Sequence, residues 1–326
     1  MTDWKGRHVL ITGGLGFIGS NLAHRLVKHG TDVTLLDALL PHLGGKRANV
    51  ADIAEQVRIV EGDLRDESLV ADLVADSDVV YHCAAQNDRA HAGREPQMDV
   101  DINAKGTVNI LDAAASADPA PRVVYTSSLA VYGRPESNPV DESTPARPMD
   151  LYGANKRASE HYCRIYYEQE GVPTTVCRLA NGYGPRAPIE KGYGVQGTFV
   201  AKALRGETIE VFEPGDMIRD IVYIEDIVDA LETLGTNDAV LGEEFVLGSG
   251  DPTELLDLAE TVVDVAGTGA AELVPWPPEW TKIDRGDVYC DPSKLESTID
   301  WQPRTDLETG LRETIEFYRA NRETYL

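Results

Sequence analysis

A glycine-rich turn between a strand and a helix is the feature that most constrains how this chain can fold. The apolar run His8–Thr12 leads directly into Gly13-Gly14-Leu15-Gly16-Phe17-Ile18-Gly19, which fits both G-x-G-x-x-G and G-x-x-G-x-x-G. Glycines lack a β-carbon, so the backbone can turn tightly and approach a pyrophosphate, whose charge meets the free N–H groups of the helix start. The motif predicts a dinucleotide site whose residues include Gly13, Gly16, Phe17, Ile18 and Gly19.

Asp37 identifies the dinucleotide more closely. It follows the predicted strand Asp32–Leu36 and stands 18 residues after Gly19. A carboxylate at this place accepts the adenosine ribose hydroxyls and repels a 2′-phosphate. The alternative is a plain glycine turn with a solvated aspartate, which the strand–turn–helix context disfavours. We therefore expect the cofactor to be NAD rather than NADP.

Apolar, β-branched runs alternate with helical stretches from residue 8 to about residue 179. The predicted strands are His8–Thr12, Asp32–Leu36, Val57–Val60, Val79–His82, Val123–Thr126 and Thr174–Arg178. The predicted helices are Phe17–His29, Glu67–Val74, Val100–Ala117 and Tyr152–Glu170. Strands that read as apolar on both faces and alternate with helices indicate an α/β protein with a doubly wound (Rossmann) parallel sheet.

The alternation of strands and helices ends after Arg178. Glycine and proline in residues 181–197 predict that the chain leaves the sheet without forming a strand or a long helix there. Further helices are predicted at Gly197–Arg205, Glu225–Leu234, Thr253–Ala266, Ser293–Ile299 and Leu307–Arg322, and short strands at Ile209–Phe212, Ile221–Tyr223 and Glu244–Leu247. We assign residues 1–178 and about 220–247 to a nucleotide-binding domain, and about 179–219 and 248–326 to a smaller α/β substrate-binding lobe.

The charge of the chain excludes several partners. Asp and Glu number 55 against 30 Lys and Arg, so the formal net charge is -25. Such a polyanion is repelled by nucleic acid and by an anionic membrane, and we expect neither as a partner. Two interpretations of the acidic surface remain open: a halophilic protein kept soluble in concentrated salt, which we favour, or an ordinary acidic cytosolic enzyme.

The four cysteines, at positions 83, 163, 177 and 290, form no C-x-x-C pair. This spacing argues against a disulfide framework and against a zinc site, so we expect a reducing environment and no metal. No apolar stretch approaches the roughly 18 residues of a membrane span. The sequence therefore predicts a soluble, cytoplasmic protein.

Tyr152 and Lys156 form the second chemical signal. At positions i and i+4 of a predicted helix, the phenol and the ammonium lie on one face, where the positive charge favours the phenolate and makes it usable as a base near neutral pH. A Y-x-x-x-K pair alone is usually plain helix surface. Here it follows a strand that ends in Thr126-Ser127-Ser128, and ligands bind beyond the carboxyl ends of such strands. A serine there can bond the substrate oxygen that loses its proton.

The chain resembles the extended short-chain dehydrogenase/reductase family, and within it the nucleotide-sugar enzymes typified by UDP-glucose 4-epimerase. The resemblance spans nearly the whole chain and rests on motifs in order. They are Thr12–Gly19, Gly62–Asp66, His82–Ala85, Asn103–Thr107, Thr126–Ser128, Tyr152 with Lys156, Arg178–Asn181, and Arg219 with Asp220. The resemblance implies a sugar-nucleotide substrate.

The resemblance also implies roles for individual residues. Cofactor contacts are implied for Asp63 and Leu64 at the adenine, Ala84 and Ala85 along the pyrophosphate, Asn103 in the supporting hydrogen bonds, and Lys156 at the nicotinamide ribose. Ser128, Tyr152 and Lys156 match the catalytic residues. Substrate contacts are implied for Ser127 and Ser128, and for Asn181, Arg219 and Arg285 at the diphosphate, Arg285 replacing an arginine usually found at the place of Asp284. Helices Val100–Ala117 and Tyr152–Glu170 are expected to pair with their copies in a homodimer.

One departure bears on the reaction. Related 4,6-dehydratases carry an Asp-Glu pair just after the active-site hydroxyl, to protonate and remove a water, and this chain has Leu129 and Ala130 at those places. Simple dehydration is therefore disfavoured. We expect an NAD-dependent 4-epimerase; the alternatives are a nucleotide-sugar reductase or dehydrogenase, a dehydratase, and a non-catalytic NAD-sensing protein.

Overall fold

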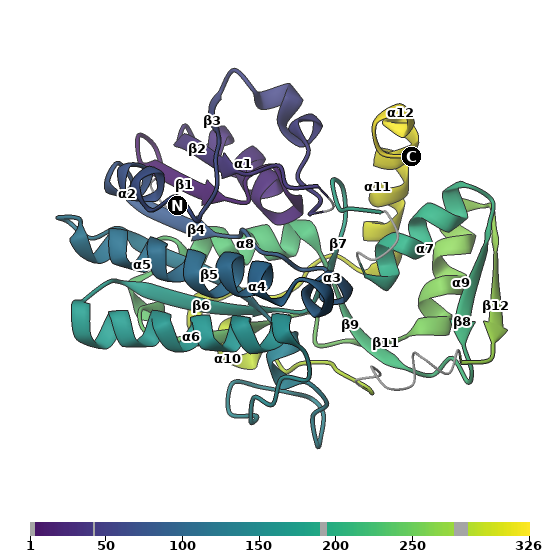
Figure 1. Ribbon diagram of the computed structural model, residues 1–326. Coiled ribbons are helices and arrows are strands. Elements are labelled where there is room, and N and C mark those ends of the chain that lie inside the picture. The colour runs from purple at the N-terminus through teal and green to yellow at the C-terminus, as the bar shows by residue number, and fades with distance from the viewer. Residues whose placement is uncertain (1–3, 42, 190–193, 277–285) are drawn as a thin grey trace.

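A seven-stranded parallel sheet forms the centre of the molecule in the computed structural model, which describes residues 4–41, 43–189, 194–276 and 286–326 (Figure 1). The strand order is β10-β6-β5-β4-β1-β2-β3. The strands are β1 (His8–Thr12), β2 (Asp32–Asp37), β3 (Val57–Glu61), β4 (Val79–His82), β5 (Arg122–Ser128), β6 (Thr174–Leu179) and β10 (Glu244–Leu247). The doubly wound α/β fold expected from the alternating pattern is confirmed.

Helices cover both faces of this sheet. On one face α2 (Glu67–Ala75), α5 (Gly106–Ser116) and α6 (Leu151–Glu170) lie side by side and share one apolar core (Figure 1). On the other face α1 (Phe17–Lys28) packs against α8 (Ile224–Leu234) over a second, larger core. Parallel strands are joined by crossovers that leave both faces to be covered, which is why their side chains are apolar on both sides.

Shorter helical elements lie between the main ones. They are η1 (Arg47–Ile53), α3 (Arg89–Arg94), α4 (Pro96–Asp99), the π-helix η2 (Val100–Lys105), the 3-10 turn η3 (Leu129–Tyr132) and η4 (Asp238–Val240). The stretch Val100–Ala117, expected to be one helix, is therefore divided: η2 runs directly into α5. The change coincides with Gly106, a residue that is unfavourable within a helix, and no proline stands at the junction.

The second part of the chain contributes two small sheets, seen on the right of Figure 1. One has the order β11-β9-β7, with β7 (Asn181–Tyr183), β9 (Ile218–Tyr223) and β11 (Pro252–Glu254); the other pairs β8 (Thr208–Phe212) with β12 (Ala270–Val274). Their helices are α7 (Val195–Leu204), α9 (Leu255–Ala266), α11 (Leu307–Ala320) and α12 (Arg322–Tyr325), and α10 (Ser293–Ile299) packs on β10 and α8.

Two expectations for this part are wrong. Residues 181–183 do form a strand, because Asn181 to Tyr183 pair in parallel with Ile221 to Tyr223 of β9, a partner that the local glycine content does not reveal. The helix expected at Thr253–Ala266 begins at Leu255, because Pro252–Glu254 pair with β9 as an antiparallel strand. The division into a nucleotide-binding domain and a substrate-binding lobe stays a prediction.

Within the described ranges, no helix is both long enough and apolar enough to cross a membrane.

Candidate active site

A cleft of about 210 Å³ runs along the carboxyl ends of β1, β2, β3 and β4. The residues that line it are Gly13, Gly16, Phe17, Ile18, Gly19, Leu36, Asp37, Ala38, Leu40, Leu43, Gly45, Gly62, Asp63, Leu64, Cys83, Ala84, Ala85, Asn87, Ile102 and Pro188. Every predicted cofactor residue except Asn103 and Lys156 is among them. The carboxyl ends of β1 to β4 thus bring together lining residues from Gly13 to Asn87, as expected for a doubly wound fold, and Ile102 and Pro188 join them from later in the chain.

The floor of the cleft requires glycine at two positions. Gly13 has a φ of +66°, and a β-carbon on it would lie 2.8 Å from the main-chain nitrogen of Ala84. A β-carbon on Gly19 would lie 2.4 Å from the main-chain oxygen of Gly13. A side chain at Gly13 would push the turn away from the segment after β4, and one at Gly19 would push α1 away from the turn. The glycines therefore bring the start of α1, with its unpaired N–H groups, close to the cleft, where a pyrophosphate can bind.

Asp37 ends β2 at the wall of the cleft. Its carboxylate accepts hydrogen bonds from the main-chain nitrogens of Leu15 (3.0 Å) and Leu39 (2.9 Å). Burial raises the pKa of Asp37, and these two N–H groups oppose that rise. Two N–H donors leave lone pairs of the carboxylate free, so the side chain can still accept the hydroxyls of a ribose.

Asp63 and Leu64 form the next part of the cleft wall. Arg65 donates to the Asp63 carboxylate from Nε (2.9 Å) and from a terminal nitrogen (2.6 Å), and this pairing holds the pKa of Asp63 below its usual range. Leu64 is buried. The combination of an oriented carboxylate and an apolar side chain suits the edge and the face of a flat heterocycle.

Asn103 lies behind the cleft wall rather than on it. Its amide donates to the main-chain oxygen of Gln86 (2.9 Å) and to Asp99 (3.0 Å), and its side-chain oxygen accepts from the main-chain nitrogen of Gln86 (3.0 Å). Both amide hydrogens are used in these contacts. Asn103 therefore fixes the segment after β4 that includes Ala84 and Ala85.

Lys156 and Tyr152 lie on the first turns of α6. The helix begins after Asp150, whose carboxylate accepts a hydrogen bond from the Gly153 nitrogen at 2.8 Å. Lys156 Nζ lies 5.9 Å from the centre of the Tyr152 ring. The i, i+4 spacing thus brings the two side chains together as predicted. Cys83 lines the cleft, whereas Tyr152 and Lys156 are not among its lining residues, so their contact with a bound cofactor stays a prediction.

Ser128 ends β5, and its Oγ accepts a hydrogen bond of 3.2 Å from the Ala130 nitrogen. Ser127 differs from it: the side chain is buried and donates from Oγ to Glu160 Oε1 at 2.6 Å. The Ser127 hydroxyl is thus bonded to a carboxylate of α6 in this structure, and the substrate contact expected for Ser127 stays a prediction.

The predicted diphosphate residues lie on the three-stranded sheet. Asn181 on β7 donates to the main-chain oxygen of Asp220 at 3.1 Å. Arg219 on β9 donates to the main-chain oxygens of Ile218 (2.7 Å) and Gly286 (2.8 Å). The two side chains come from neighbouring strands, and their binding to a diphosphate stays a prediction. Arg285 lies outside the described residues.

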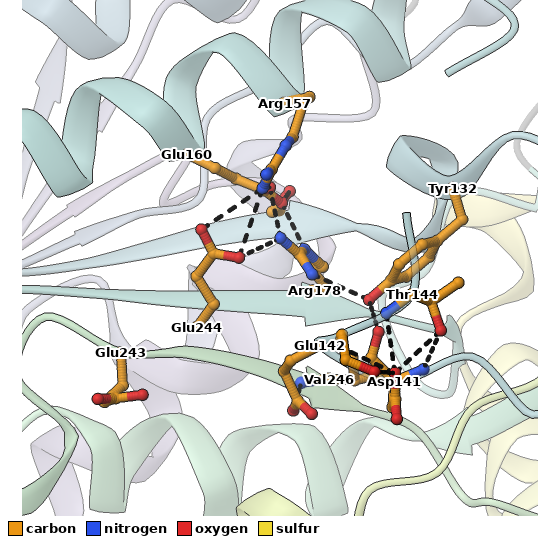
Figure 2. Close-up of polar contacts among 12 residues, drawn as sticks. Tyr132, Asp141, Glu142, Thr144, Arg157, Glu160, Arg178, Glu243, Glu244 and Val246 are labelled. Atoms are coloured by element: carbon orange, nitrogen blue, oxygen red, sulfur yellow. Dashed lines mark hydrogen bonds and ion pairs between the residues drawn. The ribbon is translucent and has the colours of Figure 1, made fainter. Parts of the chain in front are cut away.

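Two buried charges near the site had no predicted role. Arg178 on β6 and Glu160 on α6 form a bidentate ion pair (Figure 2), and Glu160 also accepts the hydrogen bond from Ser127. The sequence contained two signals for them. Glu160 continues the spacing of Tyr152 and Lys156 by another four residues, and Arg178 places a charge in an apolar strand.

Comparison with known proteins identifies the kind of chain. The model of the "NAD dependent epimerase/dehydratase family" matches residues 9–248. Among curated proteins, the low-salt glycan biosynthesis protein Agl12 of Haloferax volcanii is 34% identical over 97% of this chain and 99% of its own length. A dTDP-glucose 4,6-dehydratase of Mycolicibacterium smegmatis is 32% identical over 96% of this chain and 93% of its own length. A putative UDP-glucose 4-epimerase of Methanocaldococcus jannaschii is 32% identical over 97% of this chain and 100% of its own length.

Solved structures agree with the fold. The UDP-glucose 4-epimerase of Thermotoga maritima, solved with UDP-glucose, superposes with a TM-score of 0.87 at 28% identity and covers 96% of this chain and 99% of its own. The UDP-glucose 4-epimerase of Thermus thermophilus, solved with NAD, gives 0.85 at 30% identity over the same shares. The expected NAD dependence is confirmed, whereas these similarities do not separate an epimerase from a dehydratase.

Proposed function

The chain belongs to the NAD-dependent epimerase/dehydratase family, and from this premise we propose that it is a nucleotide-sugar 4-epimerase of the UDP-glucose type. The cleft fits NAD, because its glycine floor lies at the start of α1 and the Asp37 carboxylate lies on its wall. When bound, NAD accepts the hydrogen of sugar C4 together with two electrons and later returns them. The residues of the chain bind and orient the cofactor and the sugar, and they move the proton.

Tyr152 is the base in this proposal. The phenolate takes the proton of the sugar 4-hydroxyl, Ser128 bonds the same oxygen, and the Lys156 ammonium favours the ionised phenol. Lys156 also holds the nicotinamide ribose. The resulting 4-keto sugar turns over in the site, so that the hydrogen would return to the opposite face of C4 while Tyr152 returns the proton to the C4 oxygen. The reaction causes no net oxidation, so NAD can stay bound.

The two residues after Ser128 carry the choice of an epimerase. Leu129 and Ala130 are buried and apolar, with 6% and 3% of their surfaces exposed. Neither can donate or accept a proton. A 4,6-dehydratase needs an acid and a base at this place to remove the C5 proton and the 6-hydroxyl, so the apolar pair favours the reaction that needs only the C4 steps.

The test combines a substrate panel with a solvent label. The purified protein, loaded with NAD, is incubated in deuterium oxide with UDP-, dTDP-, GDP- and CDP-hexoses, and the products are resolved by NMR. An epimerase inverts C4 and leaves every carbon-bound hydrogen unlabelled, because the hydrogen returns from the cofactor. A 4-keto-6-deoxy product with deuterium at C5 would establish a dehydratase, and free NADH would establish a dehydrogenase.

We also propose a homodimer. The exposed large apolar side chains include Val100, the first residue of η2, and Leu151 and Ile165 on α6. Leu151 and Ile165 are 14 residues apart and lie on the same side of α6. Pairing of this face with its copy would remove them from water. A cytoplasmic location and adaptation to concentrated salt also stay proposals, supported by the unpaired cysteines and the net charge.

A further inference from the structure

A cluster of four charged side chains contains two buried groups and two partly exposed ones (Figure 2). It comprises Arg157 and Glu160 on α6, Arg178 on β6 and Glu244 on β10. Arg178 donates to Glu160 through Nε and a terminal nitrogen, each at 2.9 Å, and also pairs with Glu244. Glu160 is fully buried and Arg178 is 1% exposed. Two guanidinium groups balance two carboxylates, so the cluster is neutral.

The cluster holds the end of β5 from one side. Ser127 Oγ donates to Glu160 Oε1 at 2.6 Å, and one turn earlier on α6 the Lys156 Nζ donates to the main-chain oxygen of Thr126 at 2.8 Å. Two residues of α6 thus bond two successive residues of β5. The next residue of the strand is Ser128, which we assign to the sugar 4-hydroxyl.

The cluster also holds the turn that follows Ser128. A terminal nitrogen of Arg178 donates to the phenol oxygen of Tyr132 at 2.9 Å, and that phenol donates to the main-chain oxygen of Asp141 at 2.6 Å. Tyr132 ends the 3-10 turn η3. Arg178 is therefore linked to the chain on both sides of Ser128, through Glu160 to Ser127 before it and directly to Tyr132 after it.

Stability alone does not account for a charged cluster at this place. Apolar side chains of similar volume often stabilise a buried site as well as an ion pair does, because burying charges is costly. A bidentate guanidinium–carboxylate pair instead restricts both distance and angle. Here it connects α6, which carries Tyr152 and Lys156, to β6, and the same Glu160 carboxylate accepts the hydrogen bond from Ser127 on β5.

We infer that Glu160, held by Arg178, is a positioning residue that fixes α6 against the end of β5, so that Tyr152 and Ser128 meet on one oxygen of the substrate. The inference rests on the proposed function in one respect: both hydroxyls act on the same sugar oxygen. Reactions of this kind lose rate steeply when the reacting groups shift by about 1 Å.

The test uses Ser127→Ala and Glu160→Gln, singly and together. Glutamine keeps the volume and one acceptor oxygen but loses the charge, whereas Ser127→Ala leaves every ion pair in place. With saturating sugar nucleotide, the rate of reduction of bound NAD should fall about 10- to 100-fold in each variant, with KM and the Kd for NAD within about twofold of wild type. The double variant should be no slower than the slower single variant.

A second readout needs no substrate. In the NAD-free protein, amide hydrogen exchange should become faster in residues 122–132 and 151–170 of both variants. Glu244→Gln is the matched control, because it removes a carboxylate from the same cluster but on β10, away from β5. It should lower the melting temperature while leaving NAD reduction and exchange in these two segments close to wild type.

Three results would overturn the inference. One is NAD reduction at the wild-type rate in Ser127→Ala. This result is sufficient by itself if Glu160→Gln does not fold. Another is an equal loss of rate in Glu244→Gln, which would show a general effect of stability. The third is a raised KM in Ser127→Ala while Glu160→Gln keeps the KM and the rate of wild type. This result would make Ser127 a direct substrate contact. Wild-type protein that reduces NAD but yields no epimer would refute the epimerase proposal and leave this comparison intact.

Discussion

Lys156 donates a hydrogen bond of 2.8 Å from Nζ to the main-chain oxygen of Thr126. The ammonium also lies 4.7 Å from the centre of the Tyr125 ring, and only 2% of the residue is exposed. Burial lowers the pKa of Lys156 from 10.5 to about 8. The side chain assigned to the phenolate and to the ribose is therefore charged at neutral pH but titrates in weakly alkaline solution.

The first prediction is a pH-dependent difference in stability between the NAD-free wild type and Lys156→Met. Between pH 8 and 10.5 the unfolded wild type binds a proton at this lysine that the folded protein has lost, so wild-type stability rises with pH across this window. Below pH 8 both states are protonated, and the folded state bears the cost of a buried charge. The free energy of unfolding of the variant, measured with urea, should therefore exceed that of wild type most at pH 7.

The size of the change follows from the shift. About 2.5 pKa units correspond to about 3 kcal/mol, by which the difference between the two proteins should narrow from pH 8 to 10.5. Lys28→Met, which removes an exposed lysine on α1, should show a nearly constant difference from wild type across the same window. A constant difference for Lys156→Met as well would contradict the lowered pKa.

The second prediction concerns the base. Tyr152→Phe removes the phenol oxygen and preserves the ring, so NAD binding should survive while kcat falls about 10²- to 10⁴-fold. Ser128→Ala should lower kcat by a smaller factor, because the base remains. The loss should nevertheless be clear, since the Ser127 hydroxyl is bonded to Glu160 and is not free to replace it. Ser128→Thr, which keeps a hydroxyl, is the matched control, and wild-type turnover of Tyr152→Phe would refute the mechanism.

Local patterns were sufficient to predict most of the main sheet. The bounds of β1, β4 and β10 agree with those expected, because each is a short apolar run limited by polar or glycine residues. The glycine turn and Asp37 could be predicted equally well, because their places depend only on positions within one strand–turn–helix unit. In contrast, β7 forms because it pairs with β9, almost 40 residues later, and nothing within Asn181–Tyr183 indicates that partner.

The residue types of the candidate site could be predicted from the sequence, but the partners that each side chain contacts could not. Ser127 and Ser128 are adjacent and chemically identical, and only the register of β5 shows that Ser127 meets Glu160. The sequence placed Asn103 at the cofactor, whereas its amide contacts the segment after β4 from behind the cleft, and its role toward the cofactor stays a prediction. The pairing of Glu160 with Arg178 requires β6 and α6 to be neighbours, which is a property of the fold rather than of either segment.

The third prediction concerns cofactor choice. Asp37→Ser removes the carboxylate that would repel a 2′-phosphate, so the ratio of the Kd values for NADP and NAD should shift toward NADP by about 1 to 3 kcal/mol. The ratio is the informative quantity, because the variant also loses the bonds from Leu15 and Leu39 and both affinities will fall. Asp63→Asn, at the next strand, should change both affinities together. Wild-type protein that prefers NADP would show that Asp37 does not face the ribose.

The fourth prediction is stabilisation by salt. Self-repulsion among 25 net negative charges weakens the folded state, and molar salt screens it. The melting temperature should rise between 0.1 M and 2 M KCl. A variant with Asp72, Asp76 and Glu272 changed to their amides loses three exposed charges and should show a smaller rise. A melting temperature that is flat or falls with salt would leave the acidic surface without this explanation.

The last prediction is the dimer. Ile165 is 38% exposed and Leu151 is 40% exposed on α6, and a large apolar side chain at such a position gains stability when a partner covers it. Sedimentation of wild type at micromolar concentration in high salt should give about twice the chain mass of 35.6 kDa. Ile165→Glu places a charge in the centre of the expected contact, which should return the mass to that of one chain while NAD binding is kept, since the residue lies more than two turns of α6 beyond Lys156. Leu273→Glu, at an equally exposed apolar position on β12, is the control and should remain dimeric. A wild-type mass near 35.6 kDa would reject the dimer, and a dimeric Ile165→Glu would place the contact on another face.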